Sequence, residues 1–313
     1  MIVIAGAGAF GTALAIALGR EERSVCLWGR SVSGLAETRQ NARYLPGIEI
    51  PRAVSITANS DCFSQAEVVL LSIPMQALSG FVADHEAALR GKALVACCKG
   101  VDLTTLRGPS AVLRAACPDS PVSVLTGPSF AVDIARGLPT ALTLAGADET
   151  LQARLSTPSL RLYRSSDLIG AELGGALKNV IAIAAGVVMG AGLGDSARAA
   201  LMTRGFAEMQ RFALHKGARA QTLAGLSGFG DLVLTCTSAQ SRNFRLGHSI
   251  GAGIEFDPSI TVEGAATARA VAALAERDGI DMPITRMIAA LVARRITLAE
   301  AIQALMSRPL KEE

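Results

Sequence analysis

Lys178 is the only cation in the apolar stretch that runs from Asp167 to Asp195. Burial disfavours an ammonium group, so the pKa of this lysine should fall toward neutrality unless a carboxylate compensates. A lysine with such a pKa can pass a proton at a carbinol oxygen. An isolated lysine commonly extends from a helix edge into solvent instead, and that alternative stays open on these residues alone.

Three other polar residues could assist Lys178. Asp231 follows Gly228-Phe229-Gly230 on a predicted loop, where its carboxylate could orient the lysine or hold a substrate hydroxyl, although aspartate after glycine is also ordinary turn chemistry. Lys99 follows a predicted strand, and ligands of doubly wound sheets bind outside the carboxyl ends of strands. It could equally end that strand toward solvent. Asn179 could donate an amide hydrogen bond near the substrate or form a packing bond between helices.

A short polar group, Ser241-Arg242-Asn243, precedes a segment with helical periodicity. The first N–H groups of such a helix, the Ser241 hydroxyl and the Asn243 amide would form an anion site. The Arg242 guanidinium can make two parallel hydrogen bonds to phosphate oxygens. The pattern therefore favours a phosphorylated ligand, with a helix N-cap beside an exposed arginine as the alternative.

Other kinds of reactive site have little support in the sequence. The histidines His85, His215 and His248 fall on amphipathic helices or their edges, which favours surface positions over a catalytic triad or a metal cluster. No metal is expected. The six cysteines lack a C-x-x-C pair and are expected to be reduced, mostly core residues; they are Cys26, Cys62, Cys97, Cys98, Cys117 and Cys236.

A glycine-rich turn near the N-terminus predicts a dinucleotide site. Gly6, Gly8 and Gly11 form a G-x-G-x-x-G pattern between a predicted strand and a helical run. They permit the tight turn, the approach of a pyrophosphate and close packing of helix on sheet. Arg30 follows the second predicted strand, where NAD enzymes usually place a carboxylate. A guanidinium there suits a 2′-phosphate, which favours NADP(H), with NAD(H) as a second cofactor.

Two kinds of periodicity divide the chain. Up to about Arg164, short apolar runs alternate with helical segments, which predicts a doubly wound α/β domain of the Rossmann type over residues 1–166. From Asp167 onward only helical patterns occur, which predicts an all-α domain over 167–313. The expected strands are 2–5, 25–28, 68–73, 93–98, 122–125 and 141–145, and the expected second-domain helices are 167–193, 195–216, 241–251, 263–278, 284–294 and 298–306.

Composition excludes several classes of partner. The formal net charge is +3, and no run of Lys and Arg is longer than a pair, so a nucleic-acid partner is not expected. The longest uncharged stretch, 179–194, is too short and too rich in glycine for a membrane span. The first residues lack the features of a signal peptide, which favours the cytoplasm.

Several further segments, taken together, carry a resemblance to a known family. They are 44–47 (YLPG), 98–100 (CKG), 126–131 (TGPSFA), 174–182 (GGALKNVIA), 228–237 (GFGDLVLTCT), 241–243 (SRN) and 262–264 (VEG). In this order they span nearly the whole chain. Together they resemble the corresponding segments of bacterial NAD(P)-dependent glycerol-3-phosphate dehydrogenases. Thr261 departs from the apolar residue usual there, so the contacts at the nicotinamide end of the cofactor are less closely matched.

The resemblance implies reversible reduction of dihydroxyacetone phosphate to sn-glycerol 3-phosphate, which supplies glycerophospholipid synthesis. It implies Lys178 as general acid and base, and substrate contacts by Lys99, Gly127, Ser129, Lys178, Asp231, Ser241, Arg242 and Asn243. It implies cofactor contacts by Phe10, Arg30, Lys99, Ala131, Arg242 and Glu263, beside the three glycines of the turn. A homodimer is one expectation for the assembly. The alternatives are a related two-domain hydroxy-acid dehydrogenase and a nucleotide-sensing protein without catalysis.

Overall fold

The computed structural model describes residues 1–306; residues 307–313, the end of the predicted all-α domain, lie outside the described part. The chain divides into two compact units. The first, here the sheet unit, comprises Met1–Gly175 and Ala213–Asp231. The second, the helical unit, comprises Ala176–Phe212 and the residues from Leu232 onward.

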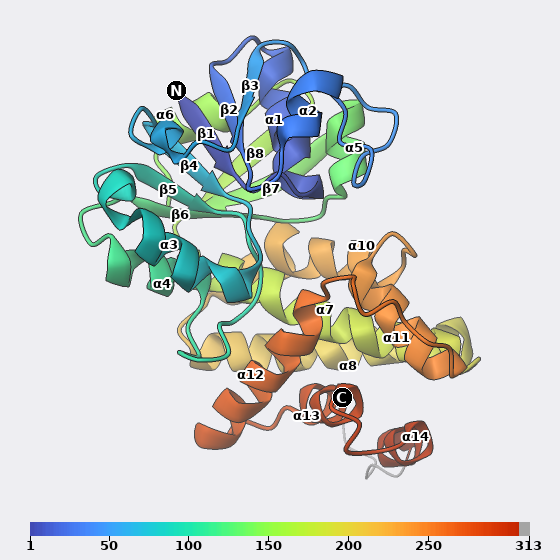
Figure 1. The fold of residues 1–313 in the computed structure, drawn as a ribbon. Helices are drawn as coiled ribbons and strands as arrows, with labels where there is room; N and C mark the ends of the chain where they lie inside the picture. The colour runs from blue at the N-terminus through green and yellow to red at the C-terminus, as the bar shows by residue number, and fades with distance from the viewer. Residues whose placement is uncertain (307–313) are drawn as a thin grey trace. The chain divides into compact units, whose positions relative to one another are not determined.

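The sheet unit is built on one mainly parallel sheet (Figure 1). Its strands in the described residues are β1 (Ile2–Ala5), β2 (Val25–Trp28), β3 (Val54–Thr57), β4 (Val68–Leu71), β5 (Ala93–Ala96), β6 (Val122–Thr126), β7 (Thr140–Ala145) and β8 (Leu160–Ser165). They lie in the order β3-β2-β1-β4-β5-β6-β7-β8. The order of the first six strands is that of a dinucleotide-binding sheet, with the change of direction between β1 and β4.

The six predicted strands are present, but β3 and β8 were missed. These two strands form the edges of the sheet and carry exposed or half-exposed residues, so neither shows the fully apolar run of a central strand. The strand β7 pairs antiparallel with β6, which departs from the parallel pairing typical of the predicted doubly wound domain. The direction of a strand depends on its connection, which an apolar run does not reveal.

Alternate residues of the central strands face two different helical layers. Ile2 and Ile4 of β1 belong to a core cluster with α1 (Ala9–Arg20), whereas Val3 and Ala5 belong to a second cluster with α3 (Met75–Leu89). This follows from the two-residue repeat of a strand, since successive side chains point to opposite faces. The other helical elements of this unit are α2 (Ser33–Thr38), η1 (Ser60–Phe63), α4 (Pro109–Ala116), α5 (Ala131–Arg136), α6 (Glu149–Leu155), α9 (Ala220–Ala224) and η2 (Leu226–Gly230).

Two long helices contribute residues to both units. They are α7 (Leu168–Gly190) and α8 (Gly194–His215). The predicted start of α7 is confirmed, because Asp167 Oδ1 accepts a hydrogen bond from the backbone N–H of Gly170 at 2.8 Å. The helix α7 is long and apolar enough to cross a membrane, but 83% of its most apolar window is buried in the protein. It is therefore a core helix.

The remaining helices are α10 (Asp231–Cys236), α11 (Arg242–Ala252), α12 (Glu263–Arg277), α13 (Pro283–Val292) and α14 (Leu298–Met306). Glycines bring α7 and α11 into backbone contact: a Cβ on Gly186 would lie 2.1 Å from the carbonyl oxygen of Phe244, and one on Gly247 would lie 1.9 Å from that of Ile183. Side chains at either position would push these helices apart.

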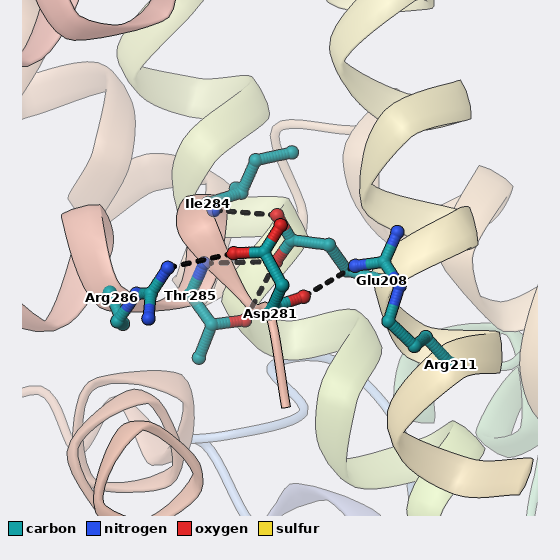
Figure 2. Close-up of polar contacts among 6 residues, drawn as sticks. All are labelled: Glu208, Arg211, Asp281, Ile284, Thr285 and Arg286. Atoms are coloured by element: carbon teal, nitrogen blue, oxygen red, sulfur yellow. Dashed lines mark hydrogen bonds and ion pairs between the residues drawn. The ribbon is translucent and has the colours of Figure 1, made fainter. Parts of the chain in front are cut away.

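A buried carboxylate joins α8 to the start of α13 (Figure 2). Glu208 is 2% exposed, and its two oxygens accept from the backbone N–H groups of Ile284 at 2.6 Å and Thr285 at 3.2 Å. Thr285 Oγ1 also lies 3.3 Å from Glu208. The first N–H groups of a helix lack partners within the helix, so Glu208 supplies them from another element and places negative charge at the positive end of α13.

Candidate active site

The glycine turn between β1 and α1 combines tight packing with open space beside the start of a helix. Gly6 has a φ of +113°, and a Cβ on it would lie 2.4 Å from the carbonyl oxygen of Ser72. A Cβ on Gly11 would lie 2.0 Å from the carbonyl oxygen of Gly6, whereas one on Gly8 would meet no atom within 4 Å. Gly6 and Gly11 are thus required by packing, while Gly8 leaves open space beside the backbone. Gly8 caps α1 without a side chain, so the first N–H groups can face a pyrophosphate.

Asn41 holds this turn in place and was not singled out from the sequence. Its side chain is 3% exposed, and its Nδ2 donates to the carbonyl oxygen of Ala7 at 3.0 Å and to Thr12 Oγ1 at 2.8 Å. These bonds tie the second residue of the glycine pattern and the first turn of α1 to a loop beyond β2. The only signal in the sequence is the position of Asn41 just before the segment 44–47.

The other residues assigned to the cofactor lie at element ends. Arg30 is exposed two residues after β2, and no carboxylate in the described residues forms an ion pair with it. Phe10 lies in the first turn of α1, and Ala131 and Glu263 are the first residues of α5 and α12. All three of these side chains are partly exposed.

Lys99 and Asp231 form an ion pair within the sheet unit. Lys99 Nζ lies 2.6 Å from Asp231 Oδ2 and 3.4 Å from the carbonyl oxygen of Gly127. The side chain of Asp231 is 1% exposed, and that of Lys99 is 20% exposed. A carboxylate this deeply buried requires a charged partner, and the lysine provides it while part of its own side chain remains accessible. These contacts bring together three residues that were predicted to bind the substrate, namely Lys99, Gly127 and Asp231.

Two expectations about this pair need correction. Asp231 does not lie on a loop, because it is the first residue of α10, directly after the π-helical turn η2. Lys99 does not follow its strand directly either: the strand was predicted over 93–98, but β5 ends at Ala96 and the loop after it carries the lysine. Gly127 has a φ of +139° and would place a Cβ 3.2 Å from Leu142 Cα, so this glycine lets the backbone pass β7 closely. Ser129, two residues on, is half-buried before α5.

Lys178 is buried within the helical unit, as its apolar surroundings predict. It is 7% exposed, and its Nζ donates to the hydroxyl of Thr235 at 2.6 Å. Thr235 is itself 3% exposed, at the end of α10. The alternative that Lys178 extends into solvent is therefore wrong. Thr235 was not assigned a role from the sequence, because 57 residues separate it from the lysine.

The predicted helix start at Ser241 is confirmed. Ser241 is the N-cap of α11, and its Oγ accepts from the backbone N–H of Phe244 at 3.1 Å. As this bond uses an oxygen lone pair, the hydroxyl hydrogen remains able to donate to a ligand. Arg242 is exposed and has no ion pair with a described residue. The carboxamide of Asn243 contacts Asn179 and Gly264 within the same unit.

The histidines and cysteines also have defined places. His85 is half-buried and packs against Phe81 with ring centroids 4.6 Å apart, so the expected surface position is wrong for this histidine. His215 and His248 are exposed. All six cysteines are free thiols, and five of them are buried, as predicted.

Two family models and several curated proteins are similar to this chain over nearly all of its length. The family models described as NAD-dependent glycerol-3-phosphate dehydrogenase N-terminus and C-terminus match residues 1–152 and 167–303. A protein of Cereibacter sphaeroides named glycerol-3-phosphate dehydrogenase (NAD(P)+) is 63% identical, with all of both chains covered. A protein of the same name from Ruegeria sp. is 60% identical over 100% of this chain and 99% of its own length.

Solved structures show the same similarity. The crystal structure of glycerol-3-phosphate dehydrogenase from Coxiella burnetii matches with a TM-score of 0.94 and 34% identity over 98% of each chain. D-mandelate dehydrogenase matches with a TM-score of 0.62 at 12% identity, covering 96% of this chain and 99% of its own, which shows a shared fold only.

Proposed function

Since the chain belongs to the NAD-dependent glycerol-3-phosphate dehydrogenase family and has NAD(P)+-dependent glycerol-3-phosphate dehydrogenase activity, we propose that it reduces dihydroxyacetone phosphate reversibly to sn-glycerol 3-phosphate. In this proposal the enzyme prefers NADPH and uses Lys178 as the proton donor. The buried contact between Lys178 and Thr235 is the observation that carries this assignment. The hydroxy-acid alternative gains no support from the two D-mandelate dehydrogenase structures, because at 12% and 14% identity they share the fold alone.

Lys178 acts at the carbonyl oxygen of the substrate. Its Nζ donates a hydrogen bond to that oxygen and transfers a proton as the oxygen becomes an alcohol; in the reverse direction it takes the proton back. Thr235 accepts another hydrogen of Nζ and so fixes the direction of the ammonium group. When bound, the nicotinamide cofactor supplies the hydride. A water-poor surrounding strengthens the effect of the charge on the oxygen, which the low exposure of Lys178 supports.

Lys99 and Asp231 assist by binding and orientation. The ammonium of Lys99 is available to a substrate oxygen through its accessible part, while Asp231 holds it in one direction. Gly127 and Ser129 supply backbone and hydroxyl groups close by in the sequence. The proposed substrate-binding set is Lys99, Gly127, Ser129, Lys178, Asp231, Ser241, Arg242 and Asn243.

The phosphate of the substrate binds at the start of α11. The helix is 11 residues long, its N-cap hydroxyl can still donate, and Arg242 has no carboxylate partner in the described residues. These features together favour a dianionic group, since helix N-termini and guanidinium groups both stabilise phosphate.

The cofactor binds at the glycine turn, whose open space at Gly8 and uncapped helix start suit a pyrophosphate. The proposed set is Gly6, Gly8, Phe10, Gly11, Arg30, Lys99, Ala131, Arg242 and Glu263. The unpaired Arg30 guanidinium supports NADP(H) over NAD(H), because its positive charge suits the 2′-phosphate that NADP(H) alone carries.

The resemblance extends the proposal to the domains, the compartment and the assembly. Residues 1–166 form the dinucleotide-binding domain and residues from 167 form the substrate domain. The enzyme acts in the cytoplasm, supplies glycerophospholipid synthesis and forms a homodimer; its molar mass in solution from light scattering tests the dimer.

Steady-state kinetics with both cofactors test the NADPH preference. The wild-type protein should oxidise NADPH when dihydroxyacetone phosphate is added, with a higher kcat/KM for NADPH than for NADH. In Arg30→Asp the ratio of the two kcat/KM values should fall on the order of 10- to 150-fold, the effect of losing a charged hydrogen bond. Arg52→Asp, at another exposed arginine of the sheet unit, is the control and should leave the ratio unchanged. The same ratio in all three proteins would place Arg30 outside the cofactor site.

A further inference from the structure

We infer that Asn243 is a positioning residue, which fixes the direction of the Asn179 carboxamide so that its NH₂ group, and not its oxygen, is presented to the substrate. The inference rests on the proposed function. It assigns the side chain of Asn243 to a second asparagine on the helix of Lys178 and leaves the backbone N–H of Asn243, in the first turn of α11, for the proposed substrate contact.

Two consecutive hydrogen bonds connect Gly264, Asn243 and Asn179, and the donor at the Gly264 end cannot become an acceptor. The backbone N–H of Gly264 can only donate, and it lies 3.0 Å from Asn243 Oδ1. The oxygen of the Asn243 carboxamide must therefore face Gly264. Its NH₂ group then faces the other way and donates to Asn179 Oδ1 at 2.9 Å. The direction of both carboxamides follows from one backbone group.

The NH₂ group of Asn179 is then the end of these contacts that a ligand can reach. Asn179 is 4% exposed as a whole, its Oδ1 is occupied by Asn243, and its Nδ2 is not among the described buried side-chain atoms that lack a partner. The donor therefore retains some access, and a bound molecule can supply its acceptor. The carbonyl and phosphate oxygens of dihydroxyacetone phosphate can only accept, so an NH₂ group suits them and an amide oxygen would repel them.

Local packing explains why this chain of contacts is specific. Val262 caps α12 without a side-chain bond, so Asn243 Oδ1 satisfies one of the first N–H groups of that helix. A Cβ on Gly264 would lie 2.5 Å from Asn243 Oδ1 and 2.8 Å from the carbonyl oxygen of Asn179. Only glycine allows α12 to approach both asparagines this closely. These two hydrogen bonds, from Gly264 to Asn243 and from Asn243 to Asn179, are called the relay below. The relay links the starts of α11 and α12 to the residue after Lys178.

A double-mutant cycle tests whether Asn243 acts through Asn179. Asn179→Ala, Asn243→Ala and the double variant are compared by kcat/KM for dihydroxyacetone phosphate and by the dissociation constant of this substrate for the enzyme with NADP+. Each single variant should lower kcat/KM about 10-fold, as expected for one lost hydrogen bond at a buried site. In the Asn179→Ala background, Asn243→Ala should cost less than about 2-fold. Costs that multiply would overturn the relay.

Asn243→Asp provides a second test that keeps the cap on α12. The carboxylate still accepts from Gly264, so the melting temperature should be retained, but its other oxygen forces Asn179 to donate and to turn its own oxygen toward the substrate. The added charge alone should weaken phosphate binding equally in both backgrounds. The relay requires a larger loss with Asn179 present than in the Asn179→Ala background. Equal losses would show that Asn243 acts without Asn179, whereas a wild-type protein inactive on dihydroxyacetone phosphate would contradict the proposed function itself.

Discussion

At the scale of single residues, two lysines of the proposed site contact different partners, and their proposed roles differ. Lys99 is paired with a carboxylate, which stabilises its charge and holds it in place. Lys178 is buried and donates to the hydroxyl of Thr235, which directs its ammonium group. A lysine directed in this way can give up and regain a proton at a substrate oxygen, which is the role proposed for Lys178.

Lys178→Ala should lower kcat on the order of 10²–10⁴, the usual contribution of general acid–base catalysis. Binding of NADPH should remain, because the glycine turn lies in the other unit of the chain. Fluorescence titration with NADPH and steady-state kinetics measure the two effects. Lys92→Ala, which removes a half-buried lysine whose Nζ contacts the backbone of Ser64, is the control. Activity of the Lys178 variant within threefold of wild type would exclude the proposed role.

Arg242→Lys should already raise the KM for dihydroxyacetone phosphate, because lysine cannot reproduce the two parallel hydrogen bonds of a guanidinium. The loss of a hydrogen bond to a charged group costs about 1.5–3 kcal/mol, which corresponds to a rise on the order of 10- to 150-fold. Unphosphorylated dihydroxyacetone should be affected much less. Arg245→Lys, at the next exposed arginine of α11, serves as control. If both substrates lose the same amount, Arg242 does not bind the phosphate.

At the scale of elements, carboxylates from neighbouring helices or from the same helix satisfy helix starts. Glu208 of α8 does this for α13 in the core. Glu300 does it for its own helix α14, where its Oε2 accepts from the backbone N–H of Thr297 at 2.7 Å on the surface. Both carboxylates accept hydrogen bonds from N–H groups at the start of a helix, but Glu208 is buried and Glu300 is exposed. The two residues therefore allow the effect of burial to be compared.

Glu208→Gln should lower the free energy of unfolding of the helical unit by about 1.5–3 kcal/mol, because it replaces two charged hydrogen bonds to N–H groups by at most one neutral bond. Urea denaturation followed by circular dichroism measures the midpoint. Glu300→Gln should move the midpoint less, since water can satisfy the exposed N–H groups of α14. Equal midpoint shifts in the two variants would mean that burial does not strengthen the contact at α13.

At the scale of the whole molecule, Glu172 should make the folded protein less stable as pH rises, whereas a carboxyl group with a lowered pKa has the opposite effect. Burial raises the pKa of this carboxyl in the folded protein, although Oε2 accepts from the backbone N–H of Ser110 at 2.7 Å. A raised pKa means that the folded state binds the proton more tightly than the unfolded state does. This contribution therefore becomes less favourable as pH rises from the unfolded value, about 4.3, through the folded one.

Glu172→Gln should therefore raise the melting temperature above the folded pKa, because glutamine keeps an acceptor for Ser110 without a buried charge. The gain should become small as pH falls to about 4, just below the unfolded pKa of about 4.3, because most of the wild-type carboxyl is then protonated in both states. Melting curves of both proteins between pH 4 and 8 measure it. Glu67→Gln is the control of opposite sign, since hydrogen bonds from Arg154 and the N-terminal amine lower the pKa of Glu67 to about 2. A Glu172 variant less stable at every pH would contradict the assignment.

Several features of the site follow from the sequence alone because they are local. The glycine turn, the six central strands and the starts of α7 and α11 each depend on residues within a few positions of one another, where conformational preferences and side-chain capping act. The motif positions of the family are equally local, and they identified the reaction before any contact was known.

Only the tertiary structure decided which polar groups meet. Lys99 and Asp231 are 132 residues apart in the sequence, Lys178 and Thr235 are 57 apart, and Asn179 and Asn243 are 64 apart. Each side chain alone is compatible with a solvent-exposed position. The cost of burying a charge or an amide, which selects its partner, exists only once the core has formed around it. The edge strands, the reversed β7 and the helical position of Asp231 likewise depend on neighbours that are distant in the sequence.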